Sequence, residues 1–348
     1  MGKRTVFLVV AALFAAFILI PNLHAQPLVN IETVLVDDAG NVADTRLASD
    51  GTTDHGAVSY AYRLGRYEVS IGQYTAFLSS VAAVTSQAHI VNLWNSRMAT
   101  DANIAAIART GSGTLASPYS YSVIGSADRP ITFVSWFDAA RFANWLQNGA
   151  TGAADTETGA YTLNGATNGV IFRNPTATWW LPSNDEWYKG AYYKSGSTNS
   201  GYWLYPTQSD EAPNNSIGSA SNQANYYVGV YPNGDFATGG AEYTNTQNYL
   251  TELGSFSGSE SAYGTFDQGG NVREIADTVD GKSTVMMFGG TWGSSDEFAL
   301  RSTDWRAFGA TTYEDSYTGF RLATVPEPST YALLAMSAGA LWWARRRR

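Results

Sequence analysis

Helix-capping signals stand at three places in this chain of 348 residues. In each, a serine is followed three residues later by a side chain that can reach back to the serine's own backbone N–H, and an amphipathic run comes next. The three pairs are Ser70 with Gln73, Ser135 with Asp138, and Ser183 with Glu186. The segments between them are rich in Gly, Asn, Ser and Thr. The sequence therefore predicts an α+β fold with a few short amphipathic helices, short strands and much loop.

Both ends of the chain have the form of processing signals. Two basic residues, an apolar run and a small-residue cleavage site predict that residues 1–25 are a secretory signal peptide. At the other end, a Val-Pro-Glu-Pro sequence at 325–328 leads into a short apolar stretch and a terminal run of four arginines. This tail, residues 325–348, resembles the PEP-CTERM sorting signal that exosortase-type enzymes recognise in Gram-negative bacteria. A plain membrane anchor is the alternative.

The tail also bears on location and partners. Its apolar stretch, 331–344, is shorter than the roughly 20 residues of a stable bilayer span, so we expect only transient membrane insertion, with the arginines on the cytoplasmic side. The resemblance implies an exosortase-type partner and delivery to the cell surface or the extracellular matrix of a Gram-negative bacterium.

Composition narrows the partners of the exported part. Two basic residues leave with the leader, and four leave with the tail along with Glu327, so 26–325 holds 15 basic and 29 acidic residues, a net charge of about −14. Nucleic acid is therefore not an expected partner. The chain has no cysteine and three scattered histidines, which excludes disulfides, thiol catalysis and a histidine-based iron or zinc cluster.

The stretch from 264 to 275 carries a metal-ligand signal. Asp267 and Glu274 supply hard oxygen ligands on either side of Gly269 and Gly270, and the glycines let the backbone fold back so that carbonyl oxygens point the same way. Oxygen-rich turns of this kind are typical of calcium sites. A Gly-Gly turn followed by a solvated strand is the alternative.

Long segments without periodicity surround these signals. Residues 26–57 are predicted to form an N-terminal strand or two and a loop, and Asn-Gly pairs predict a hairpin within 160–172. Residues 195–261 have little periodicity and many aromatic side chains. Loops of this length are uncommon in a compact domain unless they are functional or held by a ligand, so bound calcium would stabilise this region most.

Six motifs follow one another between residues 58 and 324. They are LGRYEVS at 64–70, PITFVSWFDA at 130–139, WLPSNDEW at 180–187, GGNVRE at 269–274, GGTW at 289–292 and GFR at 319–321. The series resembles the sulfatase-modifying factor family, the formylglycine-generating enzyme domain. The resemblance implies a loop-rich variant of the C-type lectin fold for residues 58–324.

The resemblance also implies two structural calcium sites. The ligands that it implies for one site agree with the oxygen chemistry of the Gly-Gly turn, and they are the side chains of Asp267 and Glu274 with the carbonyls of Gly270 and Val272. The other site would use Asn225 and the carbonyl of Tyr226, with Asp235 as a candidate for a further ligand.

One departure from the family separates this chain from its catalytic members. Formylglycine-generating enzymes oxidise a substrate cysteine with a copper-binding cysteine pair, and the resemblance places that pair at Ser294 and Ala299. Neither side chain can bind copper(I), which needs soft thiolate ligands. We therefore expect no copper and no formylglycine-generating activity.

Other polar residues have a structural interpretation beside a functional one. For Glu68 and Arg321, a buried ion pair or a carboxylate bonded to backbone amides is favoured over a catalytic role. Arg301 and Arg306, on either side of Trp305, would line a pocket for an acidic or sugar ligand or would stack structurally. The tryptophans expected in the core are Trp179, Trp180 and Trp187.

Three functions follow as hypotheses. The favoured one is an exported, calcium-stabilised binding or scaffold module at the cell surface or in an exopolysaccharide matrix, whose loops at 195–261 and 292–317 contact glycan or protein. The first alternative is an enzyme of unknown reaction with a non-thiol pocket on the same fold, and the second is a purely structural matrix component. A fold hosts a function only through its site, and this site lacks the family's thiol chemistry.

Overall fold

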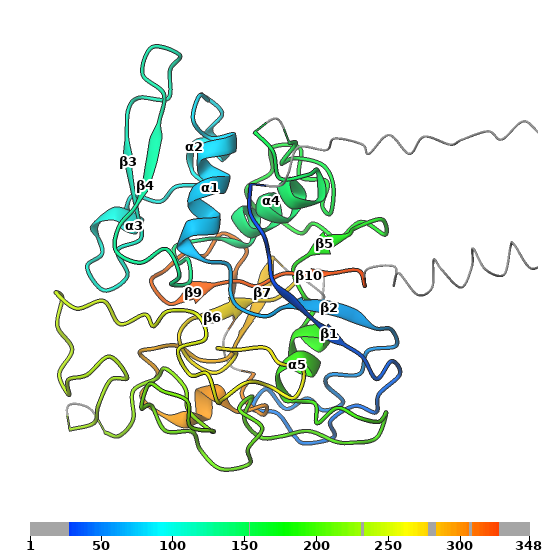
Figure 1. Ribbon diagram of the computed structural model, residues 1–348. Coiled ribbons are helices and arrows are strands. Elements are labelled where there is room, and N and C mark those ends of the chain that lie inside the picture. Colours follow the sequence, from blue (N-terminus) through cyan, green and yellow to red (C-terminus); the bar gives the residue numbers. More distant parts are fainter. Residues whose placement is uncertain (1–27, 153, 231–232, 278–282, 306–307, 327–348) are drawn as a thin grey trace, which may run out of the picture.

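The computed structural model describes residues 28–326 apart from 153, 231–232, 278–282 and 306–307 (Figure 1). The predicted signal peptide and the apolar part of the sorting tail lie outside the described residues. Within the described ranges, no helix has the length and apolar character needed to cross a bilayer. The helices are α1 (Ile71–Val81), α2 (Ala88–Val91), α3 (Arg97–Thr100), α4 (Trp136–Gln147) and α5 (Asn184–Tyr192), with a 3₁₀ turn η1 (Glu297–Leu300).

Ten short strands form three sheets in the described part of the chain. One sheet has the order β1-β2-β10-β5 and a second has the order β8-β7-β6-β9, while β3 and β4 form a separate hairpin. All pairs are antiparallel except β6 with β9. The strands are β1 (Thr33–Val36), β2 (Tyr62–Gly65), β3 (Ile107–Thr110), β4 (Ser120–Val123), β5 (Trp179–Trp180), β6 (Arg273–Ile275), β7 (Thr284–Phe288), β8 (Phe308–Ala310), β9 (Thr318–Gly319) and β10 (Ala323–Thr324).

All three predicted capping boxes are present, at the starts of α1, α4 and α5. Ser70, Ser135 and Ser183 each accept a hydrogen bond from the backbone N–H three residues on, and the side chain at that position accepts one in return. Each box satisfies two of the N–H groups that the first helical turn leaves free. The three longest helices therefore begin where the sequence predicts.

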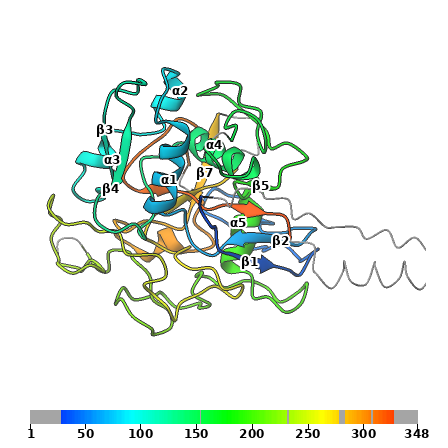
Figure 2. The ribbon, with the colours of Figure 1, turned by 45° about the horizontal axis from the view of Figure 1, so that its top comes forward.

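The core between helices and strands is largely aromatic. Phe77 of α1 lies 5.2 Å from Phe142 of α4, and Phe320, between β9 and β10, closes on Phe142 at 5.6 Å between ring centroids. Figure 1 shows α1 and α4 above the strands, and α5 with long loops below them. In both views the β3–β4 hairpin stands at the edge of the molecule (Figure 2). The core role predicted for Trp180 and Trp187 is confirmed, since both are buried.

Helix α5 packs closely against strand β2. A β-carbon at Gly190 would come within 2.3 Å of the Leu64 side chain, so a larger residue there would require Leu64 to move. The predicted N-terminal segment adds β1 to the same sheet, where it pairs with β2 over four residues. The LGRYEVS motif begins in β2 and the GFR motif ends just before β10, and these two strands are neighbours at the centre of that sheet.

The predicted hairpin within 160–172 is only partly formed. Its turn exists, because Asn164 and Gly165 take positive φ values of 49° and 82°, but the strands reduce to one antiparallel bridge between Tyr161 and Arg173. Asn144 of α4 holds the other side of the same backbone. Its side-chain amide bonds both the N–H and the carbonyl of Tyr161, at 2.8 and 2.9 Å, so this segment is fixed to the helix as well as to Arg173.

Candidate functional site

The Gly-Gly turn before β6 brings the two predicted calcium sites together. Gly270 has a φ of +83°, and a β-carbon there would lie 2.1 Å from the carbonyl oxygen of Asn225. The two residues form a parallel bridge. The Asn225 side chain donates to the Asn271 side chain at 3.0 Å, while the carbonyl of Tyr226 accepts a bond from Asn215 at 3.2 Å.

Glu274 forms a buried ion pair at the end of this turn. Arg321 donates to its two carboxylate oxygens at 2.5 and 2.6 Å, and the indole of Trp187 donates at 2.8 Å. Arg321 also donates to the carbonyls of Gly65 and Phe266. Both charged side chains are fully buried. Glu274 lies on β6 and Arg321 lies between β9 and β10. This two-bond ion pair therefore holds the two four-stranded sheets together.

Glu68 is the unsatisfied member of the same cluster. For Glu68 and Arg321 the sequence predicted a buried ion pair or a carboxylate bonded to backbone amides; the buried ion pair forms at Arg321, but its partner is Glu274 and not Glu68. The Glu68 carboxylate is buried, one oxygen accepts a long bond of 3.4 Å from Asn271, and the other oxygen has no hydrogen-bond partner. Burial raises the pKa of Glu68 well above its ordinary value, and the neighbouring charges of Asp267 and Glu274 raise it further.

Asp267 completes the carboxylate cluster, which we define as Glu68, Asp267 and Glu274. Burial raises the pKa of Asp267 to about 6, although the N–H of Gly254 donates to its carboxylate at 2.7 Å. No three His, Cys, Asp or Glu side chains in the described ranges lie in an arrangement that could hold a metal ion by themselves. A calcium site here would therefore have to include the backbone carbonyls of the turn.

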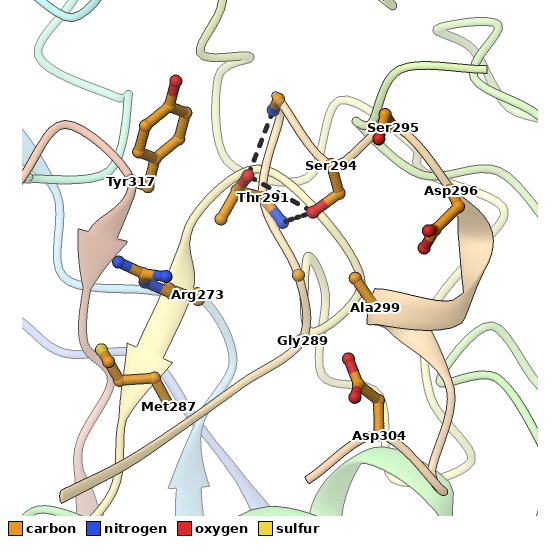
Figure 3. Close-up of a pocket in the computed structure, with 12 residues that line it drawn as sticks. Arg273, Met287, Gly289, Thr291, Ser294, Ser295, Asp296, Ala299, Asp304 and Tyr317 are labelled. Carbon is orange, nitrogen blue, oxygen red and sulfur yellow. Dashed lines mark hydrogen bonds between the residues drawn. The ribbon is translucent and has the colours of Figure 1, made fainter. Parts of the chain in front are cut away.

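A second feature is a cavity of about 400 Å³ beside β6 and β7, which we call the Ser294 pocket (Figure 3). Ser294 and Ala299, the two positions that correspond to the family's cysteine pair, both line it. The Thr291 N–H donates to the Ser294 hydroxyl at 2.9 Å, which fixes that side chain in a short turn. The other lining residues are Arg273, Met287, Gly289, Gly290, Thr291, Gly293, Ser295, Asp296, Asp304 and Tyr317.

Two pocket residues were not recognised from the sequence. Arg273 precedes Glu274 on β6, and successive strand residues point to opposite faces, so Glu274 enters the core while Arg273 faces the pocket. Asp315 orients the guanidinium at 2.6 Å and Thr318 at 2.9 Å. Tyr317 stacks on Trp292 with ring centroids 4.8 Å apart. The sequence signal for Arg273 was its position next to Glu274 on one strand, which places two opposite charges on opposite faces.

Arg301 has the structural role that was the alternative at the sequence level. Its guanidinium lies 3.8 Å from the ring centroid of Phe298 and donates to Tyr205 and Glu297. It does not line the Ser294 pocket. Arg306 lies outside the described residues.

Comparison with known proteins settles the family. The sequence matches the model for the Sulfatase-modifying factor enzyme 1-like domain over residues 22–325 and the PEP-CTERM protein-sorting motif over 324–348. This chain belongs to the sulfatase-modifying factor family. The resemblance drawn from the six motifs and from the tail is confirmed, as is the expected α+β fold with few helices and short strands.

The sorting motif adds the location of this family member. It implies recognition by an exosortase and export to the cell envelope of a Gram-negative bacterium. No curated protein matches the chain.

Three solved structures are similar to the chain at low identity. CarF is 18% identical, with 86% of this chain and 99% of that one covered and a TM-score of 0.46. PvdO from Pseudomonas aeruginosa is 17% identical, with 85% and 95% covered and a TM-score of 0.46. Treponema denticola variable protein 1 is 17% identical, with 86% and 96% covered and a TM-score of 0.44.

Proposed function

We propose that this family member is an exported, calcium-stabilised binding module of the cell surface or matrix, and that its ligand site is the Ser294 pocket. The observation that carries the proposal is the joint position of Ser294 and Ala299 on the wall of one cavity. A cavity of about 400 Å³ falls within the usual range of ligand sites, roughly 300–1,000 Å³. A cavity is present at these positions, while cysteine is absent from the sequence.

The carboxylate cluster fits calcium by its donor chemistry. Hard oxygen atoms are the ligands that calcium prefers, and the buried oxygen of Glu68 that lacks a partner is the kind of atom that a bound cation would satisfy. Asp267, Glu274 and the carbonyls of Gly270 and Val272 would hold the ion. Because Glu274 is already paired with Arg321, the ion's contribution would be to offset the buried charges of Asp267 and Glu68 and to fix the turn that supports Arg273 and the pocket wall.

A first prediction concerns the chemistry of the pocket. A cysteine-containing sulfatase peptide incubated with the purified protein, copper and oxygen is expected to remain unoxidised, because neither Ser294 nor Ala299 can hold copper(I). Mass spectrometry of the peptide after aldehyde trapping provides the measurement. A trapped aldehyde above the level of a protein-free control would contradict the proposed function.

A second prediction tests the pocket as a binding site. Ala299→Phe places a ring in the cavity and is expected to lower the retention of the purified protein on isolated Gram-negative envelope and matrix material at least tenfold. Ala116→Phe is the matched control, because Ala116 is an exposed residue at the tip of the β3–β4 hairpin, and its retention should equal that of the wild type. Equal retention of both variants would show that the pocket binds nothing in that material.

A further inference from the structure

We propose that the Ser294 pocket takes a saccharide ring, a ligand class that follows from its wall chemistry and that rests on the proposed function. One side of the pocket carries Arg273 and Tyr317, and the opposite side carries Asp296, Ala299 and Asp304 (Figure 3). The two sides therefore offer an aromatic face and hydrogen-bond donors against carboxylate acceptors.

The aromatic face is rigid. Tyr317 stacks on Trp292 at 4.8 Å, and Trp292 stacks in turn on Tyr249 at 4.7 Å with an angle of 6° between the rings. Tyr243 continues the stack at 5.6 Å from Tyr249. A ring that is held by packing loses little conformational freedom when a ligand lies on it. The apolar C–H face of a pyranose matches such a surface, since a tyrosine offers a large apolar face beside a polar tip.

The donors on the same side are held in place as well. Asp315 and Thr318 bind the Nη2 and Nε atoms of Arg273. Its Nη1 atom donates no hydrogen bond to any described residue, although the side chain is 21% exposed and lines the pocket. The paired carboxylate of Asp315 offsets the guanidinium charge, so this side does not favour an anion over a neutral ligand.

The Arg273 donor disfavours a purely cationic ligand, although the carboxylates on the facing side would attract one. A lysine ammonium has only donors, so it would bond to Asp296 and leave the Arg273 Nη1 donor without a partner. A sugar hydroxyl both donates and accepts, and a ring with several hydroxyls can accept from Arg273 while it donates to Asp296. Ser294 also lines the pocket. A neutral polyhydroxylated ring is therefore the ligand class that satisfies both sides.

The test uses the full chain, purified with calcium in a sugar-free detergent, on an array of oligosaccharides from bacterial exopolysaccharides and on a parallel array of lysine- and arginine-containing peptides. The best-bound oligosaccharide is then titrated by calorimetry. Asp296→Asn and Tyr317→Leu are each expected to weaken binding about tenfold or more. Asp37→Asn is the control and should leave binding unchanged, because Asp37 is exposed and does not line the pocket. Because Asp296 is exposed, its variant should fold normally, and circular dichroism checks both variants.

The outcomes separate this inference from the proposed function. Saccharide binding that both pocket variants weaken supports it. Saccharide binding that neither Asp296→Asn nor Tyr317→Leu alters would overturn the saccharide inference. Binding to peptides alone would also overturn it. If Ala299→Phe abolishes that peptide binding, the pocket remains a binding site for another ligand class. No binding on either array, together with envelope retention that Ala299→Phe leaves intact, would overturn both.

Discussion

Arg321→Met is expected to lower the free energy of unfolding by about 3–5 kcal/mol, measured by urea denaturation in a calcium chelator. The substitution leaves the Glu274 carboxylate fully buried with Trp187 as its remaining donor. The carbonyls of Gly65 and Phe266 lose their donors at the same time. A buried charge without its partner costs far more than the net worth of the pair, because the desolvation penalty is no longer offset.

The chain provides a matched control for this effect. Arg66 and Glu32 form an ion pair at 2.7 Å whose side chains are 34% and 53% exposed, and Arg66→Met should cost less than about 1 kcal/mol. The double variant Arg321→Met with Glu274→Leu should recover part of the loss, since an apolar replacement leaves no unpaired charge. Equal costs for Arg321→Met and Arg66→Met would contradict the assigned role of the buried pair.

The features predicted from the sequence are those that depend on near neighbours. A capping box needs only residues three apart, so Ser70, Ser135 and Ser183 marked their helices correctly. The glycine at 270 was predicted to fold the backbone back, and it does so with a positive φ. The order of motifs identified the family because each motif carries a fixed local conformation.

The features that the sequence did not predict depend on pairing across long separations. Arg321 could pair with Glu68 or with Glu274, and nothing in the sequence decides between these two carboxylates. In the structure Arg321 pairs with Glu274. The pocket role of Arg273 depends on which face of β6 meets the core. The segment near Tyr161 is fixed by Asn144, a side chain on another element. Local patterns carry no information on such contacts.

Calcium is expected to raise the melting temperature at pH 7.5 by roughly 5 °C at about 100 times its Kd, where binding to the folded state alone adds about 2.7 kcal/mol. The shift should depend on pH. Burial raises the folded-state pKa of Asp267 to about 6 from an ordinary 3.8, and that of Glu68 also lies above its ordinary value. The stability that comes from protonated Asp267 is full below about pH 4 and is lost as the pH rises through 6, and the contribution of Glu68 is likewise lost as the pH rises through its own raised pKa.

Calcium binds the ionised carboxylates. Its stabilising effect should therefore increase over the same pH range in which the protein in chelator loses stability. Melting curves at pH 5 and pH 7.5, each with calcium and with chelator, are therefore expected to show a wider gap at the higher pH. Asp267→Asn removes one ligand and one raised pKa, and should abolish the gap while raising the melting temperature in chelator at pH 7.5. Asp296→Asn, in the Ser294 pocket, should keep the wild-type gap. A wild-type midpoint that is the same in calcium and in chelator at pH 7.5 would remove calcium from the proposed function.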